Sequence, residues 1–330
     1  MIITDGCSVC LLVQVLTDAI IITLQWMSVI ILSMKRSALA IITLLSFFLI
    51  SCGFSAKPDQ DTGSGHGAQT YIENKGSDTL VNLAMAWAED YQHAHPEIQI
   101  SVTGGGSGTG FAALLNGTVD IANASREIKD EEISAARKTG IEPVEFIVAN
   151  DAIAVIVHPD NPVAQLTLEQ VASIYKGELT NWQQLGGEDR PIVCLSRETN
   201  SGTHVYFLET VIRMGSSEDK SIFSANTLLL PSSEGIIAEV SDNPNAIGYD
   251  GLGYITPEVK TIALARTAGG PYIMPSAETV LTEEYPISRH LFMYTSGQPQ
   301  GVVKDFIDWI LSPEAQVIVK DLGFVPVAVE

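Results

Sequence analysis

The stretch "VTGGGSGTGFAALL", Val102 to Leu115, decides the fold, because glycine joins the end of an apolar strand to the start of a helix. The segment "IQISV" (98–102) is short and rich in Ile and Val, as β-strands are. The residues after the glycines form an uncharged apolar run. A strand that enters a helix through glycine is typical of α/β proteins, in which such loops often hold phosphate groups.

The same alternation continues along the chain. Further strands are predicted at 119–124, 144–158, 191–196 and 246–255, and helices at 79–94, 131–140, 167–178 and 204–215. The third helix has a capping box, with Thr167 followed three residues later by Gln170. The sequence therefore predicts an α/β fold with mainly parallel central sheets, in which ligands bind at the carboxyl ends of strands.

Charge and composition exclude several classes of function. The 330 residues hold 18 Lys and Arg against 39 Asp and Glu, for a formal net charge of −21. Nucleic acid is bound through clustered Lys and Arg, so a nucleic-acid partner is not expected. His93 and His95 favour a surface pair over a metal site, and the lone Cys7-x-x-Cys10 is weak metal evidence. No metal and no cofactor are expected.

The first part of the chain has the features of a targeting segment. "MKRSALAIITLLSFFLISC", Met34 to Cys52, has a basic start and an apolar core, as a secretory signal peptide has, although a transmembrane anchor is the alternative. Its end resembles a bacterial lipoprotein lipobox, which would lipidate Cys52. We expect an over-extended start at 1–33, a signal peptide at 34–51 and a flexible tether at 52–69. Cys194 is then expected to be a buried core thiol.

Three strand-to-helix junctions share one chemistry, which is Gly with Ser or Thr at a helix start. They are Ser77-Asp78-Thr79, the opening Ser107-Gly108-Thr109 and Ser201-Gly202-Thr203. Helix N-termini offer unpaired N–H groups and a partial positive charge, and hydroxyls add short donors. Each hydroxyl alone is also an ordinary N-cap. Three such junctions meeting at one point predict an oxyanion site.

Two arginines stand beside these junctions. Arg197 precedes the third, and Ser125-Arg126 forms a fourth junction after a predicted strand. A guanidinium supplies a full positive charge and can bind an oxyanion with two parallel hydrogen bonds.

The spacing of the glycines argues against the better-known glycine loops. A Walker loop needs a Lys after its last glycine, but Phe111 follows Gly110. A dinucleotide fingerprint fails because Phe111 and Thr109 stand where its third glycine is required. A nucleophile elbow around Ser107 fails for the same reason at Thr109.

Asp78 and Asp151 are the candidate acceptors for a ligand proton. Hydrogen phosphate carries a proton that a carboxylate accepts, whereas sulfate does not carry one. Asp78 could instead only stabilise the helix dipole. Asp151 lies in "VANDAIAVIV", and its alternative role is that of a hinge residue.

The motifs together resemble the phosphate-binding lipoproteins and periplasmic proteins of ABC-type phosphate uptake systems. The resemblance covers the chain from about Tyr71 onward and rests on "GSDTL" (76–80), "GGGSGTG" (104–110), "DIANASREI" (120–128), "SRETNSGT" (196–203), "AIGYDGLGY" (246–254) and "YPISRHLFMY" (285–294). It implies a two-lobed periplasmic-binding-protein fold of type II that closes on one phosphate. The first lobe would be 70–150 plus 247–330, and the second 151–246, with a hinge between them.

The resemblance also implies which residues contact phosphate. They are Ser77, Thr79, Ser107, Gly108, Thr109, Arg197, Ser201, Gly202 and Thr203, with Asp78, Ser125 and Arg126 as further candidates. One departure concerns Arg126, because long-form members have the proton-accepting Asp at this position and short-form members have Arg. Arg289 is expected to fix the sheet of the first lobe.

The resemblance implies a non-catalytic, monomeric carrier outside the cytoplasmic membrane, anchored through lipid on Cys52, which delivers inorganic phosphate to an ABC permease. The alternatives are a carrier of sulfate, molybdate or tungstate, a secreted phosphoester hydrolase using Ser107 or Ser201, and an adhesin or sensor with this fold.

Overall fold

The computed structural model describes residues 70–327. The predicted N-terminal extension, signal peptide and tether (1–33, 34–51 and 52–69), together with Cys52, lie outside the described residues.

Helices and strands alternate through the described part of the chain. The first part contains β1 Thr70–Gly76, α2 Asp78–Ala94, β2 Ile98–Thr103, α3 Ser107–Leu115, β3 Ile121–Ala124, α4 Asp130–Lys138, β4 Pro143–Val157, β5 Gln165–Thr167, α5 Leu168–Lys176 and η2 Trp182–Leu185. The second part contains β6 Val193–Arg197, α6 Gly202–Phe207, η3 Leu208–Ile212, β7 Leu228–Leu230, α7 Ser233–Asp242, β8 Ala246–Gly251, η4 Leu252–Tyr254, β9 Lys260–Thr261, β10 Ala263–Ala265, α8 Ala277–Leu281, β11 Ser288–Ser296, α9 Gly301–Ile310 and α10 Pro313–Asp321.

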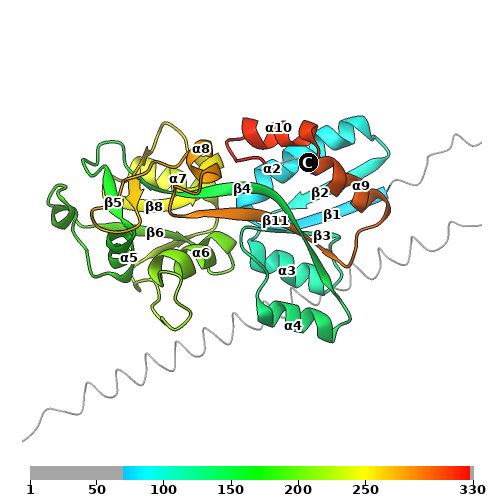
Figure 1. The fold of residues 1–330 in the computed structure, drawn as a ribbon, viewed down its shortest axis with the longest axis horizontal. Helices are drawn as coiled ribbons and strands as arrows, with labels where there is room; N and C mark the ends of the chain where they lie inside the picture. The colour runs from blue at the N-terminus through cyan, green and yellow to red at the C-terminus, as the bar shows by residue number, and fades with distance from the viewer. Residues whose placement is uncertain (1–69, 328–330) are drawn as a thin grey trace, which may run out of the picture. The chain divides into compact units, whose positions relative to one another are not determined.

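The main sheet has nine strands in the order β2-β1-β3-β11-β4-β8-β6-β7, with β9 attached to β4. Its two ends are parallel, with β2, β1 and β3 at one end and β8, β6 and β7 at the other. Its middle is antiparallel, through β11 and β4. The sheet therefore combines two parallel α/β units through an antiparallel centre (Figure 1).

β4 is the strand that joins these two units. Residues 143–152 pair with β11, and residues 153–157 pair with β8. The change of partner follows Ala152, next to the register pair of Asp151 with Arg289. One continuous strand thus supports both parallel ends of the sheet (Figure 1).

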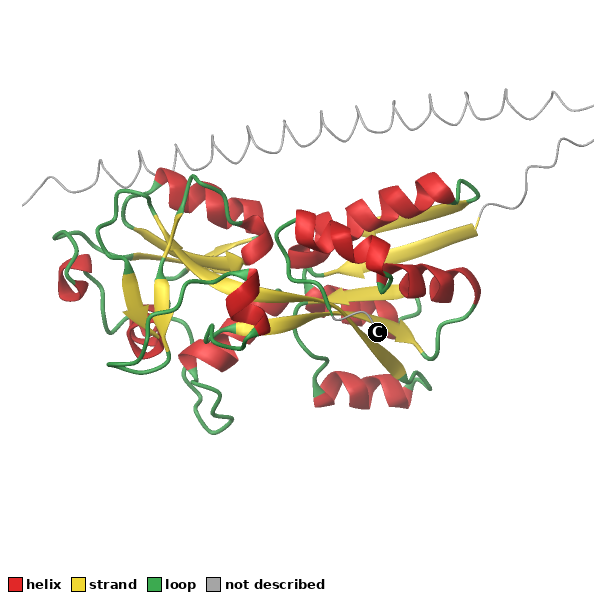
Figure 2. Ribbon diagram, turned by 45° about the horizontal axis from the view of Figure 1, so that its top comes forward, coloured by secondary structure: helices red, strands yellow, loops and turns green. Residues whose placement is uncertain are grey.

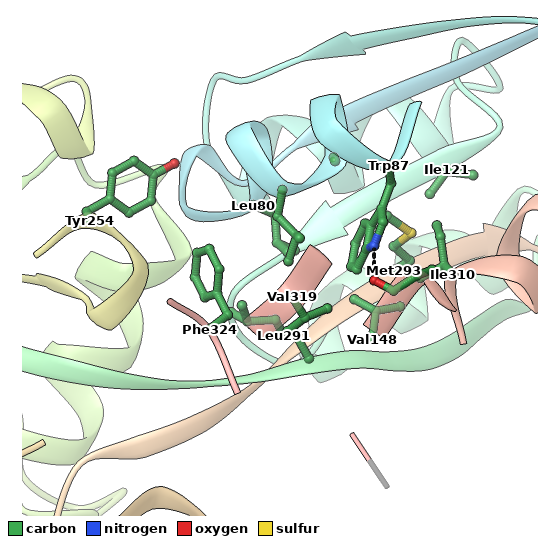
Figure 3. Packing of buried hydrophobic residues seen from close by; sticks show 14 of the residues in the cluster. Leu80, Trp87, Ile121, Val148, Tyr254, Leu291, Met293, Ile310, Val319 and Phe324 are labelled. Carbon is green, nitrogen blue, oxygen red and sulfur yellow. Dashed lines mark hydrogen bonds between the residues drawn. The ribbon is translucent and has the colours of Figure 1, made fainter. Parts of the chain in front are cut away.

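Helices cover both faces of the strands (Figure 2). On one face α2, α9 and α10 pack around Trp87, which is fully buried with Leu80, Phe306 and Val319 (Figure 3). The indole Nε1 of Trp87 donates to the carbonyl of Ala315 at 3.0 Å, so its polar atom is satisfied inside the core.

A second buried cluster lies beside β8 and α5. Its aromatic centre is Phe207 stacked on Tyr249, with ring centroids 3.7 Å apart, and Tyr175 meets both rings edge-on. The strand pair β5 and β10 contributes Leu166 and Leu264 to the same cluster.

The structure confirms most predicted elements and corrects two. The capping box of Thr167 and Gln170 is present at α5. The strand predicted at 246–255 is wrong for its last residues, because β8 ends at Gly251 and the N–H of Leu252 donates to Asp151 Oδ1 at 2.9 Å. The helix predicted at 204–215 begins earlier, at Gly202, and changes to π-helix at 208–212.

Cys194 is only half-buried rather than fully inside the core. Its Sγ donates weakly to the carbonyl of Ile174 at 3.6 Å, and burial raises the pKa of the thiol to about 12.

Candidate site at three helix N-termini

The three predicted junctions each place a helix start directly after a strand. α2 follows β1 at Ser77, α3 follows β2 at Gly106, and α6 follows β6 at Ser201. Each start exposes backbone N–H groups and the positive end of the helix dipole. The three starts are therefore chemically alike, although they are far apart in the sequence.

Hydroxyl groups bring the first and third junctions together. Thr79 Oγ1 and Thr203 Oγ1 lie 2.8 Å apart, and both side chains are buried. One side-chain hydrogen bond thus joins two residues that lie 124 positions apart in the sequence.

The second junction meets the third at Gly202. A Cβ atom on Gly202 would lie 2.3 Å from Ser107 Oγ and 2.5 Å from Ser125 Oγ. Ser107 Oγ in turn accepts from the N–H of Ser125 at 3.0 Å and lies 3.4 Å from Ser125 Oγ. Only glycine fits here, and it lets the α6 backbone approach both hydroxyls.

Backbone hydrogen bonds reinforce this contact. The N–H of Gly108 donates to the carbonyl of Asn200 at 3.1 Å, and Asn200 Nδ2 donates to the carbonyl of Gly105 at 2.8 Å. Thr109 Oγ1 donates to the carbonyls of Gly105 and Gly106 at 2.6 and 2.7 Å. In this arrangement the predicted ligand donors of Gly108 and Thr109 have partners within the protein.

Several buried side-chain donors have no hydrogen-bond partner among the described residues, and two of them belong to the junctions. Ser77 Oγ and Arg197 Nε have no hydrogen-bond partner there, although both are shielded from solvent. Ser77 occupies the N-cap position of α2 without a side-chain capping bond. Ser201, in contrast, does cap its helix, because its Oγ accepts from the N–H of Thr203 at 3.2 Å. Buried donors without partners are costly, so they indicate a missing acceptor.

Arg197 is fully buried at the end of β6 and is held at both terminal nitrogens. Nη1 donates to Ser233 Oγ at 2.8 Å, and Nη2 donates to Asp78 Oδ2 at 2.8 Å and to the carbonyl of Pro231 at 2.9 Å. Its Nε–H is the donor left over. The guanidinium thus has a fixed orientation, and Nε is its one nitrogen without a hydrogen-bond partner among the described residues.

Asp78 connects the first junction to the other two. Its Oδ1 accepts from the N–H of Gly105 at 2.7 Å, and its Oδ2 accepts from Arg197. Tyr254 Oη also donates to the backbone carbonyl of Asp78 at 2.7 Å. Both carboxylate oxygens of Asp78 are therefore already paired.

Asp151 is fully buried and forms an ion pair with Arg289 at 2.8 Å. Burial raises the pKa of Asp151, and the guanidinium and hydrogen bonds of Arg289 act in the opposite direction. Arg289 also donates to the carbonyl of Ser125 at 3.0 Å and to Thr79 Oγ1 at 3.4 Å. The pair thus links the central strands to the junction hydroxyls.

Arg126 turns toward α4. Both of its terminal nitrogens donate to the carboxylate of Glu132 at 2.8 Å, and its guanidinium lies 4.8 Å from the centre of the Phe111 ring. Its Nε is buried without a partner among the described residues.

His204 lies in the first turn of α6, with Nδ1 3.0 Å from Ser196 Oγ and its ring stacked on Phe223. Burial lowers the pKa of His204, which favours the neutral ring. Its hydrogen bond joins Ser196 and not Ser107 or Ser201, the candidate nucleophiles of a hydrolase.

Sequence reasoning missed three residues of this cluster: Asn200, Ser233 and Asp250. Asn200 and Asp250 stand inside the motifs that were recognised, "SRETNSGT" and "AIGYDGLGY". A charged residue in the apolar strand β8 was a usable signal. Nothing in the sequence indicates a role of Ser233 at the site, because serine is an ordinary residue at the start of a helix.

Between Thr70 and Val327, the helices are too short or too polar to cross a bilayer. Within the same range, no three His, Cys, Asp or Glu side chains are grouped to hold a metal ion.

Comparisons with known proteins identify the family of this chain. The family model of a PBP superfamily domain matches residues 62–314. The phosphate-binding protein PstS of Pseudomonas aeruginosa is 35% identical over 289 residues, which cover 82% of this chain and 87% of the relative. PstS of Bacillus subtilis is 32% identical over 310 residues, which cover 89% and 95%.

Solved structures give the same result. A Clostridium perfringens protein assigned to phosphate ABC transport as a substrate-binding protein, solved with bound phosphate, is 32% identical with a TM-score of 0.70. The match covers 78% of this chain and 100% of that one. An ABC-type phosphate transport receptor from Vibrio cholerae is 29% identical with a TM-score of 0.62, over 77% and 99% of the two chains.

Proposed function

This chain belongs to the PBP superfamily and, within it, to the PstS phosphate-binding proteins, and from this premise we propose that it binds inorganic phosphate outside the cytoplasmic membrane and delivers it to an ABC permease. The observation that carries the proposal is the pair of buried, unused donors, Ser77 Oγ and Arg197 Nε, beside three helix N-termini. A small tetrahedral oxyanion supplies the acceptors that these donors lack.

We propose that the anion is held mainly by hydroxyls and N–H groups of the three junctions and by one guanidinium. Ser107, Ser125 and Gly202 form the centre of this set, since they meet in the buried contact between the second and third junctions. Ser77 and Arg197 add the buried donors that have no partner among the described residues. Thr79, Ser201 and Thr203 complete it from the adjoining turns. Asp78, Gly108, Thr109 and Arg126 would have to exchange a present partner in order to contact the anion.

The two parallel ends of the sheet support a proposal of two lobes that close on the ligand. We propose that the first crossing between the lobes lies within β4, where the strand changes partner. We propose that the second crossing lies near 288, whereas the sequence predicted it near 246. β10 pairs with β5, and Tyr285 Oη donates to the carbonyl of Ile153 at 2.8 Å, so residues 263–287 lie beside the second unit.

We further propose that the protein is a carrier and not an enzyme, in keeping with the roles of its relatives as binding proteins. The hydrogen bond of His204 to Ser196 supports this view, because it leaves the junction serines without a histidine base. Lipidation of Cys52 would tether a monomeric carrier to the membrane through the segment 53–69.

The test is a calorimetric titration of the purified protein with phosphate and with sulfate at pH 8. We expect tight binding of one phosphate and much weaker binding of sulfate, and we expect Arg197→Ala to weaken phosphate binding. Arg190→Ala is the matched control, because it removes one exposed guanidinium that pairs with Glu188. Equal affinities for the two anions would favour a general oxyanion carrier, and no binding of either would refute the proposal.

A further inference from the structure

Asp250 is a fully buried carboxylate that is only half satisfied. It lies near the end of β8, where its Oδ1 accepts from Ser233 Oγ at 2.9 Å and from the N–H of Gly251 at 2.7 Å. Its Oδ2 has no hydrogen-bond partner among the described residues. Burying a carboxylate oxygen without a hydrogen-bond partner costs folding free energy, so a functional role is expected for this residue.

Asp250 is linked to Arg197, the guanidinium of the proposed anion site. Ser233 Oγ accepts from Arg197 Nη1 at 2.8 Å and donates to Asp250, so one hydroxyl connects the guanidinium to the carboxylate. The free Oδ2 lies 3.7 Å from the same Nη1. Arg197 therefore has two carboxylate neighbours, Asp78 from α2 and Asp250 from β8.

The buried charges around the junctions do not balance. The guanidiniums of Arg197 and Arg289 face three carboxylates. These carboxylates belong to Asp78, Asp151 and Asp250. One carboxylate is thus in excess in a region where charges are poorly screened by solvent.

An excess negative charge has different consequences for two similar oxyanions. Sulfate has no proton at neutral pH, so it adds only negative charge to a cluster that is already negative. Hydrogen phosphate can take up a second proton near neutral pH and bind with a single negative charge, which offsets the repulsion. A carboxylate therefore gives selectivity by penalising the wrong anion more than the right one.

We propose that Asp250 is a specificity-determining residue of the anion site, which acts through Ser233 and Arg197 and makes the site reject oxyanions that bring no proton. The proposal rests on the proposed function. Asp250 does not need to touch the ligand, because its charge acts on the anion and its hydrogen bond fixes Arg197. Ser233 is the positioning residue between them.

The charged and titratable groups around Asp250 come from several elements. Arg197 from β6 and Arg289 from β11 favour its charged form, and Tyr249 from β8 and Tyr254 from η4 lie close by. Burial is the largest influence and raises the pKa of Asp250. Lower pH should thus remove the excess charge and admit sulfate.

The test measures phosphate and sulfate affinity of the wild-type protein, Asp250→Asn, Ser233→Ala and the control Asp242→Asn. Asn has nearly the shape of Asp and keeps an acceptor at Oδ1, and it replaces the charged carboxylate with a neutral amide whose NH2 group takes the place of Oδ2. We expect Asp250→Asn to bind sulfate at least about tenfold more tightly than wild type does, and we expect a smaller change in its affinity for phosphate. Asp242 lies on the exposed end of α7, and its variant should match wild type.

Ser233→Ala separates charge from position. It keeps the carboxylate but breaks the link to Arg197, so we expect both anions to bind more weakly with an unchanged ratio. If Asp250→Asn leaves the sulfate-to-phosphate ratio of wild type, or if Ser233→Ala relaxes it equally, the inference is wrong. A wild-type protein that binds no phosphate would instead refute the proposed function.

A second measurement follows the pH dependence of sulfate binding. Sulfate stays fully ionised over this range, so its affinity for wild type at pH 8 and pH 5.5 reports on the protein groups. We expect sulfate affinity to rise as pH falls, and the rise to be absent in Asp250→Asn. A rise of equal size in both proteins would overturn the assignment of this titration to Asp250.

Discussion

Substitution of Gly202 by Ala tests whether the second and third junctions close on each other as the structure shows. The new Cβ would lie 2.3 Å from Ser107 Oγ, 2.5 Å from Ser125 Oγ and 3.1 Å from Ser107 Cβ, against an ordinary contact of 3.4 Å or more. The shortfall is about 1 Å, and rotation of the Ser107 hydroxyl cannot relieve its Cβ contact. Overpacking of this kind costs about 1–3 kcal/mol.

The cost falls on the closed arrangement, in which we propose that phosphate is bound. Since about 1.4 kcal/mol changes a dissociation constant tenfold, we expect phosphate affinity to fall roughly 5- to 150-fold. Isothermal titration calorimetry measures the change, and urea unfolding checks that the fold is intact. Gly235→Ala in α7 is the matched control, because its Cβ would meet its nearest neighbour at 3.4 Å. An unchanged affinity in Gly202→Ala would refute the proposed closure.

Three further predictions concern charge and protonation. Arg197→Ala should weaken phosphate binding by at least about 2 kcal/mol in calorimetry, because it removes the buried cation of the site, and an affinity within twofold of wild type would place Arg197 outside it. Asp151→Ala should lower the free energy of unfolding by about 3–5 kcal/mol in urea titrations, because it leaves Arg289 buried without its carboxylate, and a loss below about 1 kcal/mol would contradict this. Cys194 should react slowly with a thiol reagent at pH 8 in the native protein and quickly after unfolding, because its pKa is raised to about 12 and roughly one thiol in ten thousand is then ionised. The folded state holds the thiol proton of Cys194 more tightly than the unfolded state does. The contribution of Cys194 to the free energy of unfolding is therefore full below pH 9.0 and falls as pH rises toward about 12. Fast labelling of the native protein at pH 8 would contradict the burial of the thiol.

Local sequence was enough to predict the strand-to-helix junctions. Glycine and hydroxyl residues before an apolar periodic run specify a helix start by short-range chemistry, and α2, α3 and α6 begin there. The convergence of the junctions could be inferred only from their likeness to one another, since the contact of Thr79 with Thr203 depends on the whole sheet.

The predictions failed where tertiary contacts override local pattern. The run after Gly251 looks like a continued strand, but Asp151 accepts the N–H of Leu252 and the chain turns into η4. The half-burial of Cys194 likewise depends on how α5 covers β6.

The ion-pair and hydrogen-bond partners of charged residues could not be predicted from the sequence either. Asp78 was predicted as an acceptor for a ligand proton, yet its oxygens are shared between Gly105 and Arg197. No spacing rule connects these residues, which are brought together by three different elements. The same is true of Asp250 and Ser233 beside Arg197.

The most direct test of the central claim is a crystal structure of the protein grown with phosphate. We predict one tetrahedral anion between the three helix N-termini, within hydrogen-bond distance of Ser77 Oγ and Arg197 Nε. An anion bound elsewhere, as in the cavity of about 460 Å³ beside Arg266 and His290, with these two donors still unpaired, would contradict it.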